Sequence, residues 1–169
     1  FTVDYGWTGT VTPSLTGYVF DPVNYIITDP IADDLPNQDF TATQIVHSIT
    51  LSSGWNLVSF NVVPLDKDGD TDVDIEDVLF DIDTFYDKVY AWDATGSSSA
   101  DGNWLIYYPG STGNTLTALD AKQGFWIHMT AADKILVVYG SAYATGTEIA
   151  LHIDAGRWNL VGFPADNNL

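Results

Sequence analysis

The sequence contains no cysteine, and it has few basic residues and no long apolar run. Without cysteine the chain can form no disulfide, no thiolate nucleophile and no cysteine-ligated zinc site. No apolar run approaches the about 18 to 20 residues that a membrane-spanning helix needs, so we expect no membrane insertion. No basic-then-apolar leader precedes Phe1, and the start without Met suggests a processed or excised piece of a longer chain.

Basic residues number 5 against 23 acidic residues, which gives a formal net charge of -18. Nucleic acids and anionic membranes carry charge of the same sign, so we expect neither as a direct partner. Cations are the natural partners of such a chain. At 46% hydrophobic the sequence holds too much apolar material for an acidic disordered tail, and a globular protein is expected.

Glutamate is scarce as well, because Glu76 and Glu148 are the only two in the chain. The acidity is therefore almost entirely aspartate, which suits turns and cation loops better than helices. Short β-branched and aromatic runs alternate with turn residues, and this pattern predicts an all-β fold. Predicted strands include residues 55–63, 125–129, 148–153 and 158–163. One helix is expected at 75–85, where apolar residues recur at helical spacing, and a shorter helical turn at 116–121.

The stretch near residue 44 marks a boundary, since a Pro- and Asp-rich pattern gives way to longer apolar strands. We therefore expect two domains, residues 1–43 and 44–169. A domain of about forty residues rarely buries enough apolar surface alone, so the first segment needs something to complete it.

A Trp-Asn-Leu-Val run occurs twice, at 55–58 and 158–161. Runs that are apolar on both faces are typical of buried strands. We interpret the repeat as one kind of core strand used twice. Trp55, Trp126 and Trp158 all lie in runs that are apolar on both sides, so buried side chains are predicted for them.

Three stretches, 6–13, 17–22 and 37–43, resemble the second half of immunoglobulin-like repeats in large bacterial surface proteins. From residue 48 on, the pattern resembles a module near the C-termini of secreted bacterial and archaeal proteins, through residues 54–60, 89–92, 124–127 and 158–161. The resemblance implies an Ig-like β-sandwich piece joined to a larger antiparallel β-domain, and a secreted or cell-surface location. The Ig-like repeat begins mid-domain, so its missing strands are expected from upstream residues or from a neighbouring molecule.

Residues 66–77 read Asp-Lys-Asp-Gly-Asp-Thr-Asp-Val-Asp-Ile-Glu-Asp and resemble a dockerin-type or EF-hand calcium loop. The resemblance implies carboxylate ligands from Asp66, Asp68 and Asp70. It also implies a backbone carbonyl ligand from Asp72, a water-mediated contact from Asp74, and closure of the site by Asp77.

Two positions depart from the EF-hand pattern. Thr71 stands where glycine normally takes the left-handed turn, at a cost of about 1 kcal/mol or more. Asp77 replaces the longer glutamate, as in dockerins. The alternative is a solvated acidic loop without an ion, but seven carboxylates against Lys67 alone would repel strongly. Ca²⁺ is expected over Mg²⁺, whose rigid octahedron takes fewer protein oxygens. One loop and one helix make half of a dockerin pair, so we expect a structural role rather than a cohesin-like partner.

Aromatic residues flank a Gly/Ser-rich loop at 94–103, and they form a candidate glycan platform of Trp92, Trp104, Tyr107 and Tyr108. The sequence shows no Asn-linked glycosylation acceptor, so Ser97, Ser98 and Ser99 are the candidate sites for O-linked sugars. His47, His128 and His152 are isolated, and each is expected to be a half-buried strand residue. No phosphate loop, nucleophile elbow or His-Glu metal motif is present, so we expect no enzyme.

Together these features predict an extracellular, calcium-stabilised structural or adhesive protein, a subunit of a cell-surface filament or array assembled by β-strand complementation. Its partners would be further copies of itself or neighbouring domains of the same chain. The alternative is a carbohydrate-binding module of a secreted polysaccharide-degrading enzyme.

Overall fold

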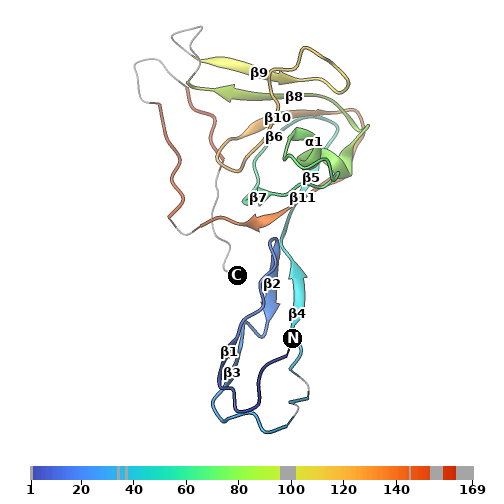
Figure 1. Ribbon diagram of the computed structural model, residues 1–169. Helices are drawn as coiled ribbons and strands as arrows, with labels where there is room; N and C mark the ends of the chain where they lie inside the picture. Colours follow the sequence, from blue (N-terminus) through green and yellow to red (C-terminus); the bar gives the residue numbers. More distant parts are fainter. Residues whose placement is uncertain are drawn as a thin grey trace. The chain divides into compact units, whose positions relative to one another are not determined.

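The computed structural model describes residues 2–33, 35–36, 38–95, 102–144, 146–152 and 158–162. Within them the chain is mostly antiparallel β-strand with a single short α-helix, so the predicted all-β fold is confirmed (Figure 1). The chain divides into two compact units, Phe1–Ile45 (unit 1) and Val46–Leu169 (unit 2). None of the helices in the described residues has the length and apolarity that a bilayer crossing requires.

The described residues of unit 1 form two separate ribbons of two strands each. Strand β1 (Gly9–Val11) pairs with β3 (Tyr25–Ile27), and β2 (Tyr18–Asp21) pairs with β4 (Thr41–Gln44), both antiparallel. The Tyr25 ring lies 5.0 Å from the Phe40 ring, and the Tyr25 hydroxyl donates to the Asp39 carbonyl at 3.0 Å. Strands of three or four residues carry few side chains that a partner strand could cover, and an isolated ribbon of this kind is marginally stable.

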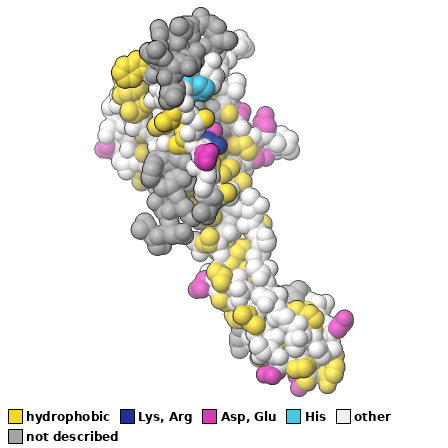
Figure 2. All heavy atoms as spheres, turned by 90° about the vertical axis from the view of Figure 1, so that its left-hand side faces the viewer, with side chains coloured by type: hydrophobic (Ala, Val, Ile, Leu, Met, Phe, Trp, Pro, Cys, Tyr) yellow, Lys and Arg dark blue, Asp and Glu magenta, His cyan; other side chains and the backbone are white. Residues whose placement is uncertain are grey.

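Apolar side chains in the described part of unit 1 are not buried. The single buried residue there is Gly17. Tyr5, Val23 and Ile26 are 84%, 71% and 69% exposed, and Figure 2 shows apolar side chains on the surface of this unit. A groove of about 470 Å³ opens in unit 1, and its apolar lining consists of Val3, Val11, Tyr25, Ile27, Ile31 and Leu35.

Two larger antiparallel sheets are formed by the part of unit 2 that the structure describes. The first has four strands in the order β6-β10-β8-β9, namely β6 (Gly54–Val58), β10 (Phe125–Met129), β8 (Tyr86–Asp93) and β9 (Asn103–Tyr107). The second has three strands in the order β5-β11-β7, namely β5 (Val46–Leu51), β11 (Lys134–Ala142) and β7 (Val62–Pro64).

Both sheets contribute side chains to one apolar core in unit 2. Phe125 and Ile127 alternate along β10 and are fully buried, as are Leu51 on β5 and Leu136 on β11. Alternation of buried and exposed positions is what a strand with one covered face requires. Unit 2 is therefore built around its own core.

The predicted strand at 55–63 is instead two strands in different sheets. Strand β6 ends at Val58 and β7 begins at Val62. Between them Phe60 is buried and its ring lies 6.1 Å from the Phe125 ring, while the Asn61 N–H donates to His47 Nδ1 at 3.0 Å. The apolar run is continuous because the chain passes through the core as it changes sheets.

The predicted helix at 75–85 is shorter than expected. Helix α1 (Ile75–Leu79) continues into a 3₁₀ turn, η1 (Phe80–Ile82), and both pack against β11. The chain then leaves the helical path, because Thr84 has φ of +70° and β8 begins at Tyr86. The apolar positions of the helical pattern are nevertheless buried, namely Ile75, Val78, Leu79 and Ile82.

Three further predicted elements are wrong within the described residues. Residues 116–121 form no helix, because the Thr115 and Leu116 N–H groups both donate to the Ile106 carbonyl, at 2.9 and 3.1 Å, and hold the chain against β9. Residues 148–152 form no strand, and residues 158–162 make a single bridge, between Val161 and Gln123. Residues 153 and 163 of these predicted strands lie outside the described residues.

Candidate metal centre

The acidic loop connects β7 to helix α1, and both of its ends are fixed to the rest of unit 2. At its start the Leu65 N–H donates to the Tyr139 carbonyl of β11 at 3.1 Å. At its end the Ile75 N–H donates to the Thr117 carbonyl at 3.0 Å. The loop is thus held at one end by β11 and at the other by the segment between β9 and β10.

Carboxylates inside the loop accept hydrogen bonds from the loop's own backbone. Asp66 accepts from the Gly69 N–H at 2.6 Å and from the Thr71 N–H at 3.1 Å. The Asp68 carboxylate accepts from the Asp70 N–H at 3.1 Å. Short polar side chains commonly organise turns in this way. The bonds fold the loop so that successive aspartates face the same region.

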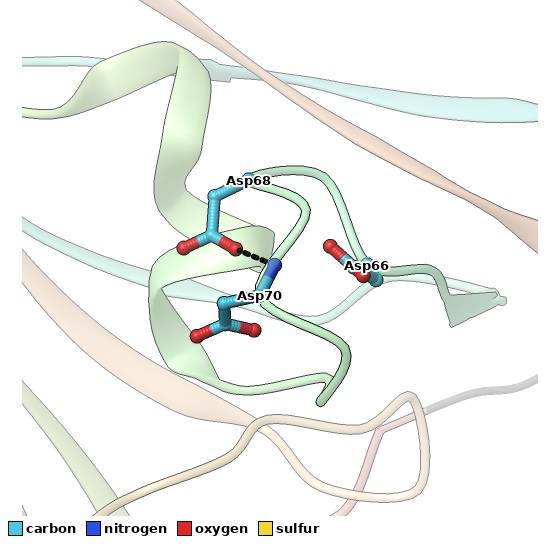
Figure 3. Close-up of side chains that lie close together, drawn as sticks. All are labelled: Asp66, Asp68 and Asp70. Atoms are coloured by element: carbon cyan, nitrogen blue, oxygen red, sulfur yellow. Dashed lines mark hydrogen bonds between the residues drawn. The ribbon is translucent and has the colours of Figure 1, made fainter.

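Three of the predicted ligands, Asp66, Asp68 and Asp70, lie together. One carboxylate oxygen from each is within 4.8 Å of the others, and Figure 3 shows the Asp66 carboxylate directed towards those of Asp68 and Asp70. Two oxygens that bind one Ca²⁺ from opposite sides are about 4.6 to 5.2 Å apart, twice the Ca–O distance. This exposed cluster could therefore hold a metal ion.

Asp72 and Asp74 belong to a second group, which they form with Asp70 on the same 4.8 Å criterion. The Asp74 side chain also caps helix α1, because it accepts from the Glu76 N–H at 2.6 Å and the Asp77 N–H at 3.3 Å. From the sequence we expected Asp72 to bind the ion through its backbone carbonyl and Asp74 to contact it through a water. In the structure both carboxylates lie beside Asp70.

Asp77 occupies a different position from the other five aspartates. Its side chain is 4% exposed, and one carboxylate oxygen accepts from the N–H groups of Lys67 and Asp68, the latter at 3.1 Å. The other oxygen accepts from the Asp74 N–H at 2.9 Å and completes the helix capping box. Asp77 joins the first residues of the loop to the last ones, and it is in neither of the exposed carboxylate groups.

Crowding of carboxylates changes their proton affinities. The hydrogen bond from the Asp70 N–H lowers the pKa of Asp68, but desolvation and repulsion from Asp70, Asp77 and Asp66 outweigh it and raise this pKa above its usual value. Between Asp70 and Asp72, a shared side-chain hydrogen bond lowers the pKa of Asp70 and raises that of Asp72. A bound cation would relieve this repulsion, because it interacts favourably with every ionised carboxylate.

Two residues for which the sequence predicted no role in binding the ion connect this region to the sheets, namely Lys67 in the loop and Glu76 in helix α1. Glu76 accepts a hydrogen bond from the Tyr107 hydroxyl of β9 at 2.7 Å. The Lys67 ammonium lies 3.5 Å from the centre of the Tyr139 ring on β11, a cation–π contact. No sequence signal pointed to either pair, because their partners lie 31 and 72 residues further along the chain.

Thr71 has φ of +85°, which is the left-handed region. From the sequence we expected this conformation at Thr71, the position where EF-hand loops carry glycine. A β-branched residue is strained there. Thr71 therefore adds backbone strain to the folded loop that glycine at this position would not add.

The candidate glycan platform divides between the two faces of the first sheet. Trp104 and Tyr108 are 50% and 41% exposed and Trp92 is half-buried, whereas Tyr107 is 5% exposed. Tyr107 is thus removed from the platform, because adjacent strand residues face opposite sides and its side chain lies in the core, bonded to Glu76. Ser97, Ser98 and Ser99 lie outside the described residues.

Two of the three tryptophans predicted to be core are exposed. Trp55 and Trp158 are 47% and 77% exposed, and Trp126 is half-buried. The prediction was wrong for Trp55 because its side chain lies beside Tyr90 and Trp126 on the face of the sheet that the core does not cover. In both copies of the repeat the asparagine has a local role: Asn56 exchanges two hydrogen bonds with the backbone of Ser52, and Asn159 with that of His152.

The three histidines are half-buried, as expected. His47 on β5 contacts Asn61, and His128 on β10 lies 2.8 Å from an Asp87 oxygen. His152 is not on a strand; its N–H donates to the Asn159 side chain at 2.9 Å. None of them joins the carboxylate groups of the loop among the residues that the structure describes.

Comparison of the chain with models of protein families, with curated proteins and with solved structures found no match.

Proposed function

We propose that the protein is an extracellular, calcium-stabilised structural or adhesive subunit, in which an extended segment of a neighbouring copy completes unit 1. The observation that carries this proposal is the absence of any buried apolar side chain in the described part of unit 1. Repetition of the contact from copy to copy would build a filament or array on the cell surface.

Added strands suit unit 1 for two reasons. Each of its four strands pairs with one partner in the described residues, so each has a second edge that can form backbone hydrogen bonds. The groove beside β1 and β3 is lined by Val11, Ile27 and Ile31, which an incoming strand would cover with its own apolar side chains. Both effects would stabilise a unit that is small and buries no apolar side chain within its described residues.

Calcium is the metal that best fits the loop of unit 2. All its candidate ligands are carboxylate or backbone oxygens, which hard cations prefer, and the loop offers more oxygens than Mg²⁺ usually takes from protein. Since the loop is bonded to β11 and to β9, the free energy of calcium binding adds to the stability of unit 2.

The loop is exposed, and ion binding must offset the backbone strain of Thr71, so we expect a weak calcium affinity. A weak affinity is typical of extracellular calcium sites. Calcium sites of extracellular modules bind with dissociation constants of about 10⁻⁴ to 10⁻³ M. A site of that strength is filled where calcium is millimolar and empty where it is scarce. Calcium would then stabilise the subunit after it leaves the cell.

The test is particle mass by multi-angle light scattering at rising protein concentration, in millimolar calcium. We expect the wild-type protein to form particles several times heavier than the monomer. Ile31→Asp places a charge in the groove and should keep the protein monomeric, while Val23→Asp changes an exposed side chain outside the groove and should assemble as wild type. A wild-type chain that stays monomeric at high concentration with calcium would refute the proposal.

A further inference from the structure

Aromatic side chains cover the outer face of the four-stranded sheet. The Trp92 and Trp104 rings are 5.1 Å apart across β8 and β9, and the Trp55 and Tyr90 rings are 5.4 Å apart. The Trp55 ring is also 6.4 Å from that of Trp126 on β10. The residues next to these aromatics along β8 and β10, such as Ala91 and Ile127, face the core instead. The face is thus a continuous aromatic surface that the core of unit 2 does not use.

At one end of this face the aromatic rings line a cleft of about 320 Å³. Its described lining consists of Trp92, Trp104, Trp126, Trp158, Asn159 and Leu160. Ligand sites are typically concave, mostly apolar and about 300 to 1,000 Å³ in volume, so this cleft is at the lower end of that range. Four indoles from three strands and a C-terminal segment converge there.

The C-terminal wall of the cleft is anchored to the sheet by hydrogen bonds. The Trp92 indole N–H donates to the Trp158 carbonyl at 2.8 Å, and the Gly124 N–H donates to the Leu160 carbonyl at 3.2 Å. The Gly162 N–H donates to the Lys122 carbonyl at 2.9 Å. A side chain at Gly162 would not fit, because its Cβ would lie 2.0 Å from the Ala121 carbonyl oxygen. Hydrogen bonds and close packing therefore fix this side of the cleft in place.

The described lining of the cleft carries no charge, although the protein has a net charge of -18. These described residues therefore offer no counter-charge to an anion or to a cation. The indole N–H groups of Trp104, Trp126 and Trp158 donate no hydrogen bond within the described part of the chain. The ligand that fits is therefore uncharged, has an apolar face and carries hydrogen-bond acceptors.

Pyranose sugars have these properties together. One face of the ring presents C–H groups that stack on aromatic faces, and the hydroxyl and ring oxygens at its rim accept hydrogen bonds from indole N–H groups. A quaternary ammonium ion also stacks on indoles, but it accepts no hydrogen bond. We propose that the cleft of Trp92, Trp104, Trp126 and Trp158 binds neutral carbohydrate. This role is separate from assembly through unit 1.

The test begins with an array of neutral and anionic glycans, followed by calorimetric titration of the protein with the neutral oligosaccharide that binds. We expect binding to neutral glycans alone. Trp104→Ala and Trp158→Ala should each weaken it about ten-fold or more, and Trp104→Phe, which keeps a stacking face but loses the N–H, should weaken it less. Both tryptophans are at least half exposed, so the variants should fold with the thermal midpoint of wild type.

Trp55→Ala is the matched control, because Trp55 is a similarly exposed tryptophan on the same face that does not line the cleft. It should change the affinity by less than about two-fold. Equal losses in Trp55→Ala and Trp104→Ala would overturn the assignment to the cleft. Binding of no neutral glycan would overturn the proposal, as would saturation by choline chloride instead. Ile31→Asp should bind the oligosaccharide as wild type does, which keeps this outcome independent of assembly.

Discussion

Units 1 and 2 are built from similar kinds of residues but differ in what their strands enclose. In unit 2, strands of three to nine residues form sheets of four and three strands, and their facing side chains are buried. In the described part of unit 1, strands of three or four residues form two ribbons and bury no apolar side chain. Apolar content alone does not make a core, because strands must be long and numerous enough to cover it.

The largest expected effect contrasts two isoleucines. Ile127 is fully buried in unit 2, and Ile127→Ala should lower the free energy of unfolding of that unit by about 2 to 5 kcal/mol. Ile27→Ala in unit 1 should cost less than about 1 kcal/mol in dilute protein, where nothing covers the groove. Urea titrations followed by NMR signals of each unit measure both values. Similar losses would show that unit 1 has a core of its own.

Calcium should stabilise unit 2 and leave unit 1 unchanged in dilute protein. At a hundred times its dissociation constant, an ion that binds only the folded state adds about 2.7 kcal/mol. Thermal unfolding with calcium and with chelator measures the difference. The combined variant Asp66→Asn, Asp68→Asn and Asp70→Asn should no longer respond to calcium, whereas Asp81→Asn, an exposed acid outside the loop, should respond normally. An equal calcium response in the triple variant would place the ion elsewhere.

Removal of the Tyr107 hydroxyl should weaken the connection between β9 and the start of helix α1, where the calcium loop ends. The buried Tyr107 side chain donates to the Glu76 carboxylate, and hydrogen bonds to charged groups contribute about 1.5 to 3 kcal/mol. Tyr107→Phe should therefore destabilise unit 2 by about this amount and weaken its calcium response. Tyr108→Phe is the control, since Tyr108 is exposed and bonds to Tyr90 instead. Equal effects of the two variants would contradict the role given to Glu76.

Alkaline pH should destabilise unit 2. Burial raises the pKa of Tyr86 to about 12, above the about 10 of an exposed tyrosine. The folded state therefore keeps a proton that the unfolded state loses, so stability is complete below about pH 10 and falls as pH rises towards 12. The loss should reach about 1 kcal/mol by pH 11. Urea unfolding at several pH values measures this loss. In Tyr86→Phe the free energy of unfolding should fall less steeply with pH. The same slope in the variant and in the wild type would contradict a buried neutral hydroxyl at Tyr86.

The smallest expected effect is a gain in the stability of unit 2. Thr71→Gly removes the strain of a β-branched residue at φ of +85° and should stabilise unit 2 by up to about 1 kcal/mol with calcium bound. Thermal unfolding and a calcium titration measure it. Thr84→Gly, at φ of +70° outside the loop, serves as the control, since it should raise the stability without altering calcium affinity. A loss of stability in Thr71→Gly would contradict the strain.

Local patterns in the sequence predicted the features that depend on neighbouring residues. The spacing of Asp66, Asp68 and Asp70 anticipated a carboxylate cluster, the period of Ile75, Val78 and Leu79 anticipated a buried helical face, and β10 has the predicted bounds. In each case the residues that interact lie within one turn, one loop or one strand. Whether the cluster binds calcium stays a prediction.

Features that depend on distant partners were missed. An apolar run such as 55–63 cannot show that it crosses between sheets, and it does not reveal that Trp55 lies on an edge strand. A shift of one residue exchanges the two faces of a strand, which is why Tyr107 was grouped with Trp104 although it points into the core. The contacts of Glu76 with Tyr107 and of Lys67 with Tyr139 depend on the same tertiary information.

The most direct test of the account is hydrogen exchange of the backbone amides, measured by mass spectrometry at low and at high protein concentration in calcium. The account predicts that amides of unit 2 are protected at both concentrations, and that amides of β1 to β4 exchange quickly in dilute protein and become protected as particles form. Strong protection of β1 to β4 in the dilute monomer would contradict it, because unit 1 would then be stable without a neighbour.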